Sequence, residues 1–311
     1  MARLEVVPFA DGHLGDAGAL LATRHARHRQ AEPLLPELTD PVGAIEKEWR
    51  RDGASGVFAA IGGKPKGYLI AAPFTVWSGP VWMTVRIAGL AVDGETEVVR
   101  DLYARAAERW VEEGHTKYAA FVPSFDSGLV DAWFRLCFGA SATLALRETA
   151  AEEPFEAGIE VRPGTPDDFA DAARLELAMS ESMISSPSFS DVPLQTHDEV
   201  LAEWNEDDGD KHKLFVAERD GRIVGQFLLY RRPPDLRVPE NSIDLSQAST
   251  DPAERGRGVG RALTAYVLRW AHENGFPVMT TDWRMTNLLA SRFWPKRGFR
   301  PVFLRVYRHI P

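Results

Sequence analysis

The sequence predicts two tandem α/β domains in one chain of 311 residues. The length exceeds the roughly 100–200 residues of a single domain. Strand-like runs alternate with amphipathic helical segments in both halves. The segments also occur in the same order twice, with landmarks separated by a nearly constant interval. These three observations together predict the fold class.

The second half shows the pattern most clearly. Asp220-Gly221 separates two strand-like runs and is a strong hairpin signal, because both residue types tolerate positive φ. Gly275 is a typical helix stop, and Thr165-Pro166-Asp167 is a typical helix start. Residues 180–213 form a polar stretch. Strands are expected at 159–162, 214–217, 223–230, 243–250, 278–282, 300–303 and 304–308, and helices at 167–179, 261–274 and 288–294.

The first half repeats this outline. Strands are expected at 4–9, 56–61, 67–73, 87–92 and 118–122, and helices at 13–29 and 98–113. Four landmark pairs have offsets of 158, 160, 161 and 159 residues: Gly67 and Gly225, Trp110 and Trp270, Gly114 and Gly275, and Gly139 and Gly298. We therefore predict a tandem duplication, with domains at 1–150 and 158–311 and a linker near 151–158. The alternative is two unrelated α/β domains of similar size.

Composition and charge exclude several classes of protein. With 36 Lys and Arg against 45 Asp and Glu, the net charge is −9, which argues against a nucleic-acid partner. The sequence contains no run of about 18 apolar residues, so no membrane span is predicted. The N-terminus lacks a signal-peptide pattern. A cytoplasmic protein without a membrane partner is expected. The single cysteine, Cys137, fits a reducing compartment and is interpreted as a small buried hydrophobe.

No metal site is predicted. His25 and His28 lie three residues apart on a predicted helix, but the pattern places no third ligand. With Arg24, Arg27 and Arg29 beside them, they are interpreted as part of a solvated basic face.

The segment 250–263 is the most informative for function. It lies between a predicted strand and a predicted helix, and it carries Gly256, Gly258 and Gly260. Such a loop lets backbone N–H groups converge on an anion while the helix N-terminus adds a positive end. Glycine permits the close approach, since a Cβ would block it. Arginines at 255, 257 and 261 add positive charge, so the loop predicts a ligand that carries a pyrophosphate.

The loop spacing discriminates among nucleotide-binding motifs. It lacks the Gly-Lys-Ser/Thr of a P-loop, and Leu263 stands where a dinucleotide fingerprint needs its third glycine. The spacing Arg255-x-x-Gly258-x-Gly260 instead resembles the acyl-coenzyme A loop of the GNAT N-acetyltransferase superfamily. Asn287-x-x-Ala290-x-x-Phe293, followed by Gly298-Phe299, is similar to a second motif of that family.

This resemblance covers residues 158–311 directly and 1–150 through the repeat. It implies two tandem GNAT-like domains, each a mixed, mostly antiparallel sheet flanked by helices. It also implies acetyl-coenzyme A as co-substrate, with the pyrophosphate on the loop amides and the thioester carbonyl on a backbone N–H of the preceding strand. The implied coenzyme-binding residues are Ala248, Ser249, Thr250, Arg255, Gly256, Arg257, Gly258, Val259, Gly260, Arg261, Asn287 and Phe293.

The catalytic residues are less clear, because the chain departs from the family pattern. Many members place a tyrosine after the Phe293 position as general acid, whereas this chain has Trp294, an N–H donor that does not usefully give up a proton. Tyr307 and Ser291 are possible substitutes, and water is another. Strand alternation is expected to place Asp244, Ser246, Ala248 and Thr250 on one face, with Asp244 as base and Ser246 holding water.

The identity of the base stays open. Asp244 could instead be a solvent-facing edge residue without a catalytic role, and Asp282 is a second candidate for the base.

The first half lacks the glycine loop. At the matching place it carries three acids, Asp93, Glu95 and Glu97, which would repel a pyrophosphate. We therefore expect a degenerate first domain and an N-acyltransferase, acetyl by default, in the second. The acceptor would be a small-molecule amine or a peptide amine that attacks the thioester directly. The alternative is a non-catalytic protein that binds acyl-coenzyme A or a partner.

Overall fold

The computed structural model describes residues 3–75, 79–150, 155, 158–190, 193–206 and 212–311. The chain forms two compact units. The first contains Met1–Thr143, Asp235–Arg237 and Pro301–Pro311, and the second contains Leu144–Pro234 and Val238–Arg300. Most of the predicted linker at 151–158 lies outside the described residues.

In the first unit, helices cover both faces of a mixed sheet. The strand order is β1-β2-β3-β4-β6-β13, and β5 pairs with β3. All these pairs are antiparallel except β4 with β6. The strands are β1 (Leu4–Pro8), β2 (Ser55–Ile61), β3 (Lys64–Thr75), β4 (Val81–Val85), β5 (Leu90–Val92), β6 (Lys117–Pro123) and β13 (Arg300–His309).

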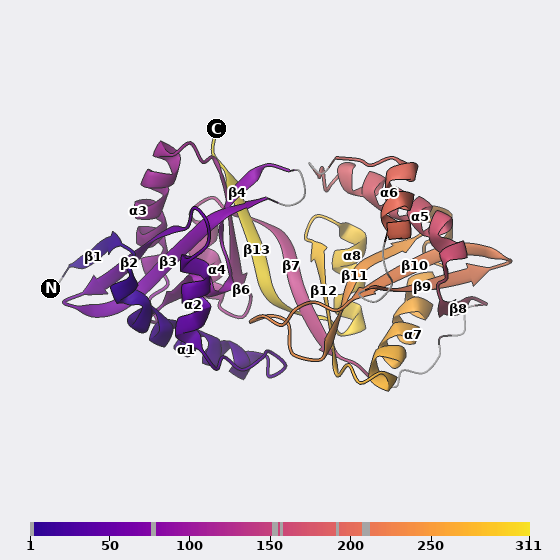
Figure 1. The fold of residues 1–311 in the computed structure, drawn as a ribbon, viewed down its shortest axis with the longest axis horizontal. Helices are drawn as coiled ribbons and strands as arrows, with labels where there is room; N and C mark the ends of the chain where they lie inside the picture. Colours follow the sequence, from indigo (N-terminus) through magenta and orange to yellow (C-terminus); the bar gives the residue numbers. More distant parts are fainter. Residues whose placement is uncertain (1–2, 76–78, 151–154, 156–157, 191–192, 207–211) are drawn as a thin grey trace. The chain divides into compact units, whose positions relative to one another are not determined.

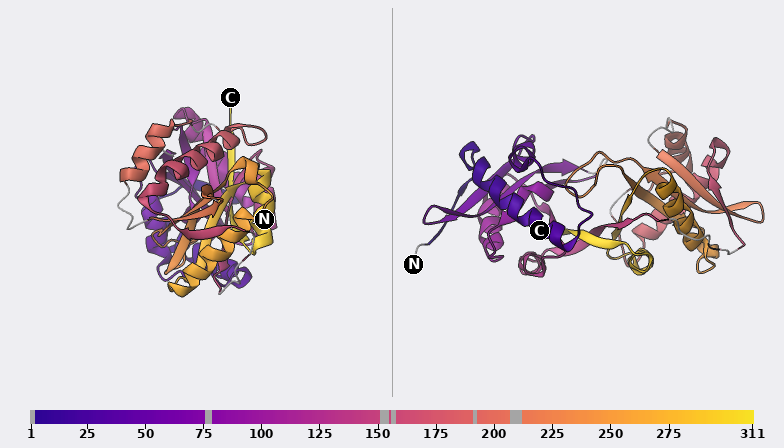
Figure 2. Two further views of the ribbon diagram at one scale, coloured as in Figure 1. Left: turned by 90° about the vertical axis from the view of Figure 1, so that its right-hand side faces the viewer. Right: turned by 90° about the horizontal axis from the view of Figure 1, so that it is seen from below.

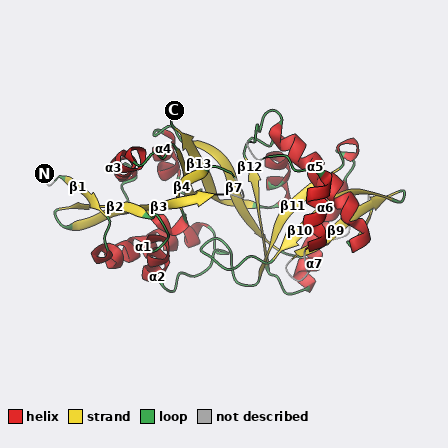
Figure 3. Cartoon of the chain, turned by 45° about the horizontal axis from the view of Figure 1, so that its top comes forward, coloured by secondary structure: helices red, strands yellow, loops and turns green. Residues whose placement is uncertain are grey.

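Two cores hold the first unit together. Helices α3 (Val98–Glu112) and α4 (Ser127–Phe134) pack on one face of the sheet around Trp110 and Trp133, which are buried. Helices α1 (Leu14–Ala31) and α2 (Pro41–Trp49) cover the other face around Leu21 and Ile45 (Figures 1 and 3).

The second unit is built in the same way. Its strand order is β8-β9-β10-β11-β12, antiparallel except for β11 with β12. Helix α7 (Val259–Glu273) covers one face, and α5 (Phe169–Ile184) and α6 (His197–Glu206) cover the other (Figure 1). The strands are β8 (Glu160–Pro163), β9 (His212–Arg219), β10 (Arg222–Tyr230), β11 (Ser242–Thr250) and β12 (Val278–Arg284), and α8 is Leu288–Phe293.

Gly225 explains how closely α7 packs on the sheet. A Cβ at this position of β10 would lie 2.5 Å from Val259 Cγ1. Since real Cβ atoms do not approach so closely, only glycine lets the first turn of α7 lie against β10. This contact sets the height of the glycine loop above the strands.

The structure confirms most of the predicted elements in both halves. Both predicted hairpins form, with positive φ at Gly62 and Gly63 and at Asp220 and Gly221. Thr165 and Asp168 form a capping box before α5, which begins two residues later than predicted.

Several expectations were wrong or incomplete. The polar stretch 180–213 contains the end of α5 and all of α6. The expected strand at 87–92 is a 3₁₀ turn, Ile87–Gly89, followed by β5. The two runs expected at 300–303 and 304–308 form the single strand β13. Besides α6, two helices and two strands were not predicted, namely α2, α4, β4 and β7 (Gly139–Glu148).

The final strand belongs to the first unit. Seven residue pairs join β13 to β6, from Phe303 opposite Pro123 to His309 opposite Lys117. The first described strand, β1, and the last strand, β13, therefore both lie in the first unit (Figure 2). The division of the chain into domains at 150 and 158 stays a prediction.

Two interpretations of single residues are corrected. Cys137 is exposed rather than buried. It lies in the turn that follows α4, where its φ is +62°. His25 and His28 are 2% and 1% exposed, so they belong to no solvated face. The His28 ring stacks on Phe125, and burial lowers its pKa to about 3. No helix in the described ranges has the length and apolar character needed to cross a membrane.

Candidate active site

The second unit contains a cavity of about 680 Å³ at the end of β11. Its walls come from the last residues of β11, the glycine loop, the first turn of α7 and helix α8, and from Met179 and Ser182 of α5. Of the twelve residues that the sequence assigned to coenzyme binding, all twelve line this one cavity.

The cavity exists because β11 and β12 diverge. Their parallel pairing runs from Ser242 opposite Val278 to Leu245 opposite Thr281 and is not continued at the following residues of β11. On its other edge, β11 pairs Gln247 with Leu228 and Leu245 with Leu229, so Ser246 is an extra, bulged residue. A bulge bends the strand and increases its twist. Beyond it, Ala248, Ser249 and Thr250 form one wall of the cavity.

The glycines of the loop have distinct conformational roles. Gly256 has φ +78° and Gly258 has φ +90°, in the left-handed region that other residues adopt only at a cost. Gly258 is the N-cap of α7. Gly260 instead permits close packing, since a Cβ there would lie 3.3 Å from the Phe293 ring.

The N-terminus of α7 presents free donors to the cavity. Ala262 N–H donates to the Gly258 carbonyl at 2.9 Å and starts the helical ladder. The N–H groups of Val259, Gly260 and Arg261 precede it and have no intrahelical acceptor. Together with the helix dipole, they make an anion-binding end.

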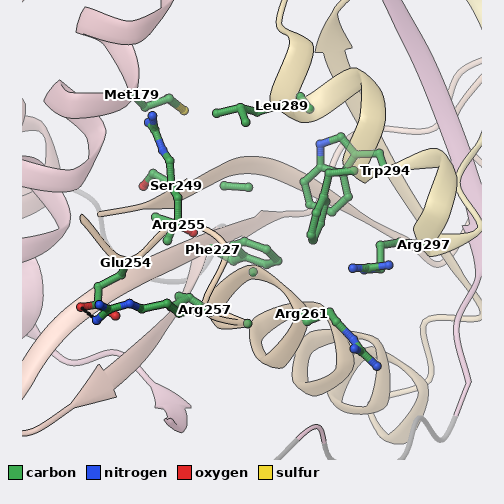
Figure 4. A pocket seen from close by; sticks show the side chains of 18 of the residues that line it. Met179, Phe227, Ser249, Glu254, Arg255, Arg257, Arg261, Leu289, Trp294 and Arg297 are labelled. Atoms are coloured by element: carbon green, nitrogen blue, oxygen red, sulfur yellow. Dashed lines mark hydrogen bonds and ion pairs between the residues drawn. The ribbon is translucent and has the colours of Figure 1, made fainter. Parts of the chain in front are cut away.

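Arginine side chains surround this end of the helix. Arg257 is neutralised by Glu254, with Nη1 to Oε1 at 3.2 Å, and Arg219 pairs with the same carboxylate. In the part of the chain that the structure describes, Arg255, Arg261 and Arg297 form no ion pair with a carboxylate. Arg261 and Arg297 lie at one side of the cavity, and Arg255 extends toward Met179 at the other (Figure 4).

Arg297 is partly buried beside the cavity. Its Nε is buried and has no hydrogen-bond partner among the described residues, and its guanidinium lies 4.6 Å from the centre of the Phe293 ring. Burial and the nearby Arg261 lower the pKa of Arg297. Two like charges held close together favour an anionic ligand with more than one charge. No motif in the sequence pointed to Arg297, although it directly precedes Gly298 of the second motif.

The second motif has a structural role. The Asn287 side chain caps α8 by accepting hydrogen bonds from the N–H groups of Leu289 and Ala290, both at 3.1 Å. Its Nδ2 lies 3.5 Å from Met183 Sδ of α5. Trp294 is 6% exposed and packs on Phe227 and Phe299, so its ring is part of the core as well as of the cavity wall.

Asp244 is neither solvent-facing nor on the same face as Ala248. Asp244 pairs with Tyr230, whereas Ala248 pairs with Phe227, three residues away on β10. Residues three apart on a regular strand lie on opposite faces of the sheet, so the bulge at Ser246 places Asp244 and Ala248 on opposite faces. Asp244 is 4% exposed, accepts a hydrogen bond from Thr280 Oγ1 at 2.6 Å and lies 2.9 Å from Arg232 Nε. Burial raises the pKa of Asp244, and Arg232 opposes that shift.

The other catalytic candidates are placed apart from the cavity wall. Ser246 is exposed and donates to the Leu228 carbonyl at 3.1 Å. Tyr307 is 44% exposed and lies on β13 in the first unit, where its ring meets Trp82. Asp282 is half-exposed, with one carboxylate oxygen 3.9 Å from Arg232. The roles assigned to these residues stay predictions.

The geometry thus combines a glycine-bounded anion site with a gap between two diverging strands. Such a site can hold a diphosphate at the helix end and place an attached group against the free edge of β11. This combination is typical of an acyltransferase.

Comparison with known proteins identifies the family. Residues 179–299 match the model of the acetyltransferase (GNAT) family. A mycothiol acetyltransferase from Parafrankia sp. (strain EAN1pec) is 27% identical over 306 residues, which cover 86% of this chain and 91% of that protein. The mycothiol acetyltransferase of Thermomonospora curvata is 31% identical over 131 residues, covering 41% of this chain and 42% of that one.

Solved structures agree on the fold. A GCN5-related N-acetyltransferase from Sphaerobacter thermophilus has a TM-score of 0.58 with 14% identity, covering 98% of this chain and 95% of its own. Residues 179–299 thus form a domain that matches the GNAT acetyltransferase family, and the similarity to a mycothiol acetyltransferase over most of the chain supports an N-acetyltransferase. The predicted fold class is confirmed: the chain is α/β, with sheets that are mostly antiparallel and flanked by helices.

Proposed function

We propose that the second unit transfers an acetyl group from acetyl-coenzyme A to a primary amine. The observation that carries this proposal is the loop at 256–261, where helix-end amides converge on one cavity with arginines that have no carboxylate partner among the described residues. In the proposed complex, the N–H groups of residues 258–261 hold the pyrophosphate, since the N–H of Arg257 already donates to the Glu254 carbonyl. Arg255, Arg261 and Arg297 balance its charge.

The acyl end would lie where β11 and β12 separate. A backbone N–H of Ala248, Ser249 or Thr250 would donate to the thioester carbonyl and stabilise the oxyanion that forms on attack. Loss of one such donor costs about 2.7–4 kcal/mol of transition-state stabilisation in a characterised enzyme. The amine attacks the carbonyl carbon directly, and coenzyme A leaves as a thiolate. Because thiols have a pKa near 8.5, the leaving group needs little help from an acid.

The acceptor is proposed to be a small molecule. The chain is similar along most of its length to a mycothiol acetyltransferase, so an amine related to mycothiol is the first acceptor to test. Release of free thiol from acetyl-coenzyme A can be measured with that amine, glucosamine, spermidine and a short peptide. We expect turnover with one of these four amines. Thermal stabilisation by acetyl-coenzyme A without any turnover would instead favour a binding protein.

The coenzyme position is tested by a matched pair of glycine substitutions. Gly256 and Gly275 both have φ +78°, and a Cβ at either would meet nothing within 4 Å. Aspartate therefore strains both sites alike, but only Gly256→Asp adds a carboxylate to the anion site. We expect Gly256→Asp to weaken acetyl-coenzyme A binding at least about 10-fold, the loss of one charge-assisted contact. Calorimetry should show Gly275→Asp binding like the wild type; equal affinity of both variants would contradict the placement.

A further inference from the structure

Glu176 is a half-buried carboxylate that the coenzyme cavity does not use. It lies on α5, one helical turn before the cavity-lining Met179. One carboxylate oxygen accepts a hydrogen bond from Gln247 Nε2 at 2.7 Å, and the other accepts one from Trp204 Nε1 at 3.0 Å. A strand residue and a helix residue therefore hold it in a fixed orientation against the sheet.

The carboxylate is held beside the divergence of the strands. Gln247 stands between the bulged Ser246 and Ala248, which lines the cavity. The pairing of β11 with β12 ends only two residues earlier, at Leu245. Glu176 is therefore anchored at the place on β11 where the proposed thioester would meet the acceptor.

A group of polar atoms connects this position with the cavity. Gln226 and Ser249 are opposite each other on β10 and β11, on the same face as Gln247. The amide of Gln226, the Oε1 atom of Gln247 and the hydroxyl of Ser249 are buried with no hydrogen-bond partner in the described part of the chain. Buried polar groups are normally satisfied by protein, water or ligand. Since Ser249 also lines the cavity, these atoms offer a polar path from the cavity toward Glu176.

The charges around Glu176 favour a proton acceptor. Burial raises the pKa of Glu176, and Glu203 of α6 raises it further, whereas the bonds from Gln247 and Trp204 oppose the shift. The residues facing it from β10 and β11 near Gln247 are uncharged, namely Gln226, Leu228 and Ser249. Asp244 shares this face of β11, but Arg232 and Thr280 already engage its carboxylate.

We propose that Glu176 is the general base that accepts a proton from the ammonium group of the acceptor, relayed by water held by the polar atoms of Gln226, Gln247 and Ser249. This inference rests on the proposed function. One ammonium proton passes to the Glu176 carboxylate and then to solvent. The neutral amine forms the new C–N bond at the thioester carbonyl, and the C–S bond breaks. The second N–H proton goes to the departing thiolate through solvent, which leaves an amide and free coenzyme A.

The test compares Glu176→Gln with Glu181→Gln, an exposed glutamate on the same helix. Thiol release is measured between pH 5 and 9 with the fastest of the four amines named above, and acetyl-coenzyme A binding is measured by calorimetry. The carbonyl oxygen of a glutamine can still accept the bond from Trp204, and its NH2 group can donate to the oxygen of a flipped Gln247 amide, so the fold is retained. We expect Glu176→Gln to bind the coenzyme normally, to lose about 100-fold or more in kcat and to lose the acid limb of the pH profile. Glu181→Gln should match the wild type.

The outcomes separate the inference from the function on which it rests. Glu176→Gln with kcat within threefold of the wild type and an unchanged acid limb would overturn the assignment. The same loss in Asp244→Asn but not in Glu176→Gln would transfer the role to Asp244. Wild-type protein that binds acetyl-coenzyme A but acetylates none of the four amines also contradicts base catalysis by Glu176. Wild-type protein that does not bind acetyl-coenzyme A contradicts the proposed function itself.

Discussion

At the scale of single residues, the ion pair of Asp244 and Arg232 allows a prediction. Replacing Arg232 should lower the stability of the fold, and the size of this loss should depend on pH. Asp244 is buried, and Arg232 supplies the compensating charge at 2.9 Å. Removing one partner of a buried pair leaves an uncompensated charge and costs about 3–5 kcal/mol. We expect Arg232→Met to lose stability in this range at pH 8.

The same variant should be less destabilised at low pH. Burial raises the folded-state pKa of Asp244 above its unfolded value, and loss of Arg232 removes the charge that opposes this shift. A raised carboxyl pKa means that the folded state binds the proton more tightly, so stability falls as pH rises between the two values. Urea unfolding should give a smaller deficit at pH 5 than at pH 8. Arg231→Met, an exposed neighbour, is the control, and a deficit independent of pH would contradict the explanation.

Single residues also show which parts of the site could be predicted from the sequence. The residues that line the cavity could be brought together from the sequence because glycine spacing and basic residues form a local motif, which needs no knowledge of distant contacts. The faces of β11 could not be predicted. Strict alternation assumes a regular strand, and the bulge at Ser246 exchanges the faces of the residues on either side. Glu176 was not identified for a related reason, since its partners Gln247 and Trp204 are far away in sequence.

At the scale of secondary structure elements, α8 depends on its first residue. Asn287 accepts hydrogen bonds from the N–H groups of Leu289 and Ala290, the typical arrangement of an N-cap. The family resemblance implied that Asn287 helps to hold the coenzyme, whereas its contacts in the structure show the capping role. A substitution that keeps the cap but changes the side-chain amide can separate the two roles.

We expect Asn287→Ala to lower the free energy of unfolding by about 0.5–2 kcal/mol, because two helix-end donors lose their acceptor. Asn287→Asp should restore most of this stability, since aspartate caps equally well and favours the positive helix end. Urea unfolding measures the stability, and calorimetry measures acetyl-coenzyme A binding. If Asn287→Asp is stable but binds the coenzyme as weakly as Asn287→Ala, the amide itself contacts the ligand.

Helices and strands were predicted well where a local sequence pattern specifies them. They were predicted poorly where their formation depends on packing or pairing with a distant segment. The hairpins and the long amphipathic helices follow from periodicity and glycine positions. Helix α6 was read as part of a polar stretch because only Val200 and Trp204 of its ten residues are buried. Strand β13 was divided in two, and its place beside β6 in the first unit depends on pairing over nearly 200 residues of sequence. No local signal specifies such a pairing.

At the scale of the whole molecule, the two units share an architecture but differ at the start of one helix, α3 in the first unit and α7 in the second. In the second unit, the amides at the start of α7 precede the first ladder bond, at Ala262. In the first unit, the amides at the start of α3 are already engaged. Val98, Val99 and Arg100 donate to the carbonyls of the preceding turn, at 3.2, 3.1 and 2.9 Å.

Charge at this turn of the first unit also opposes an anion. Asp93 pairs with Lys66 at 2.7 Å, and Glu97 pairs with Arg100 at 3.0 Å and also with Arg135. The basic residues are thus already neutralised by carboxylates of the same turn. The second unit offers the reverse arrangement, with arginines that have no carboxylate partner in the described ranges.

We therefore expect one acetyl-coenzyme A per chain. Calorimetric titration of the full chain should give a stoichiometry near one and a single affinity. Gly256→Asp should weaken that single event without uncovering a second one, because the engaged amides and the carboxylates of the first unit cannot hold a pyrophosphate. A stoichiometry near two, or a site of wild-type affinity that persists in Gly256→Asp, would show that the first unit binds the coenzyme in spite of its acidic turn.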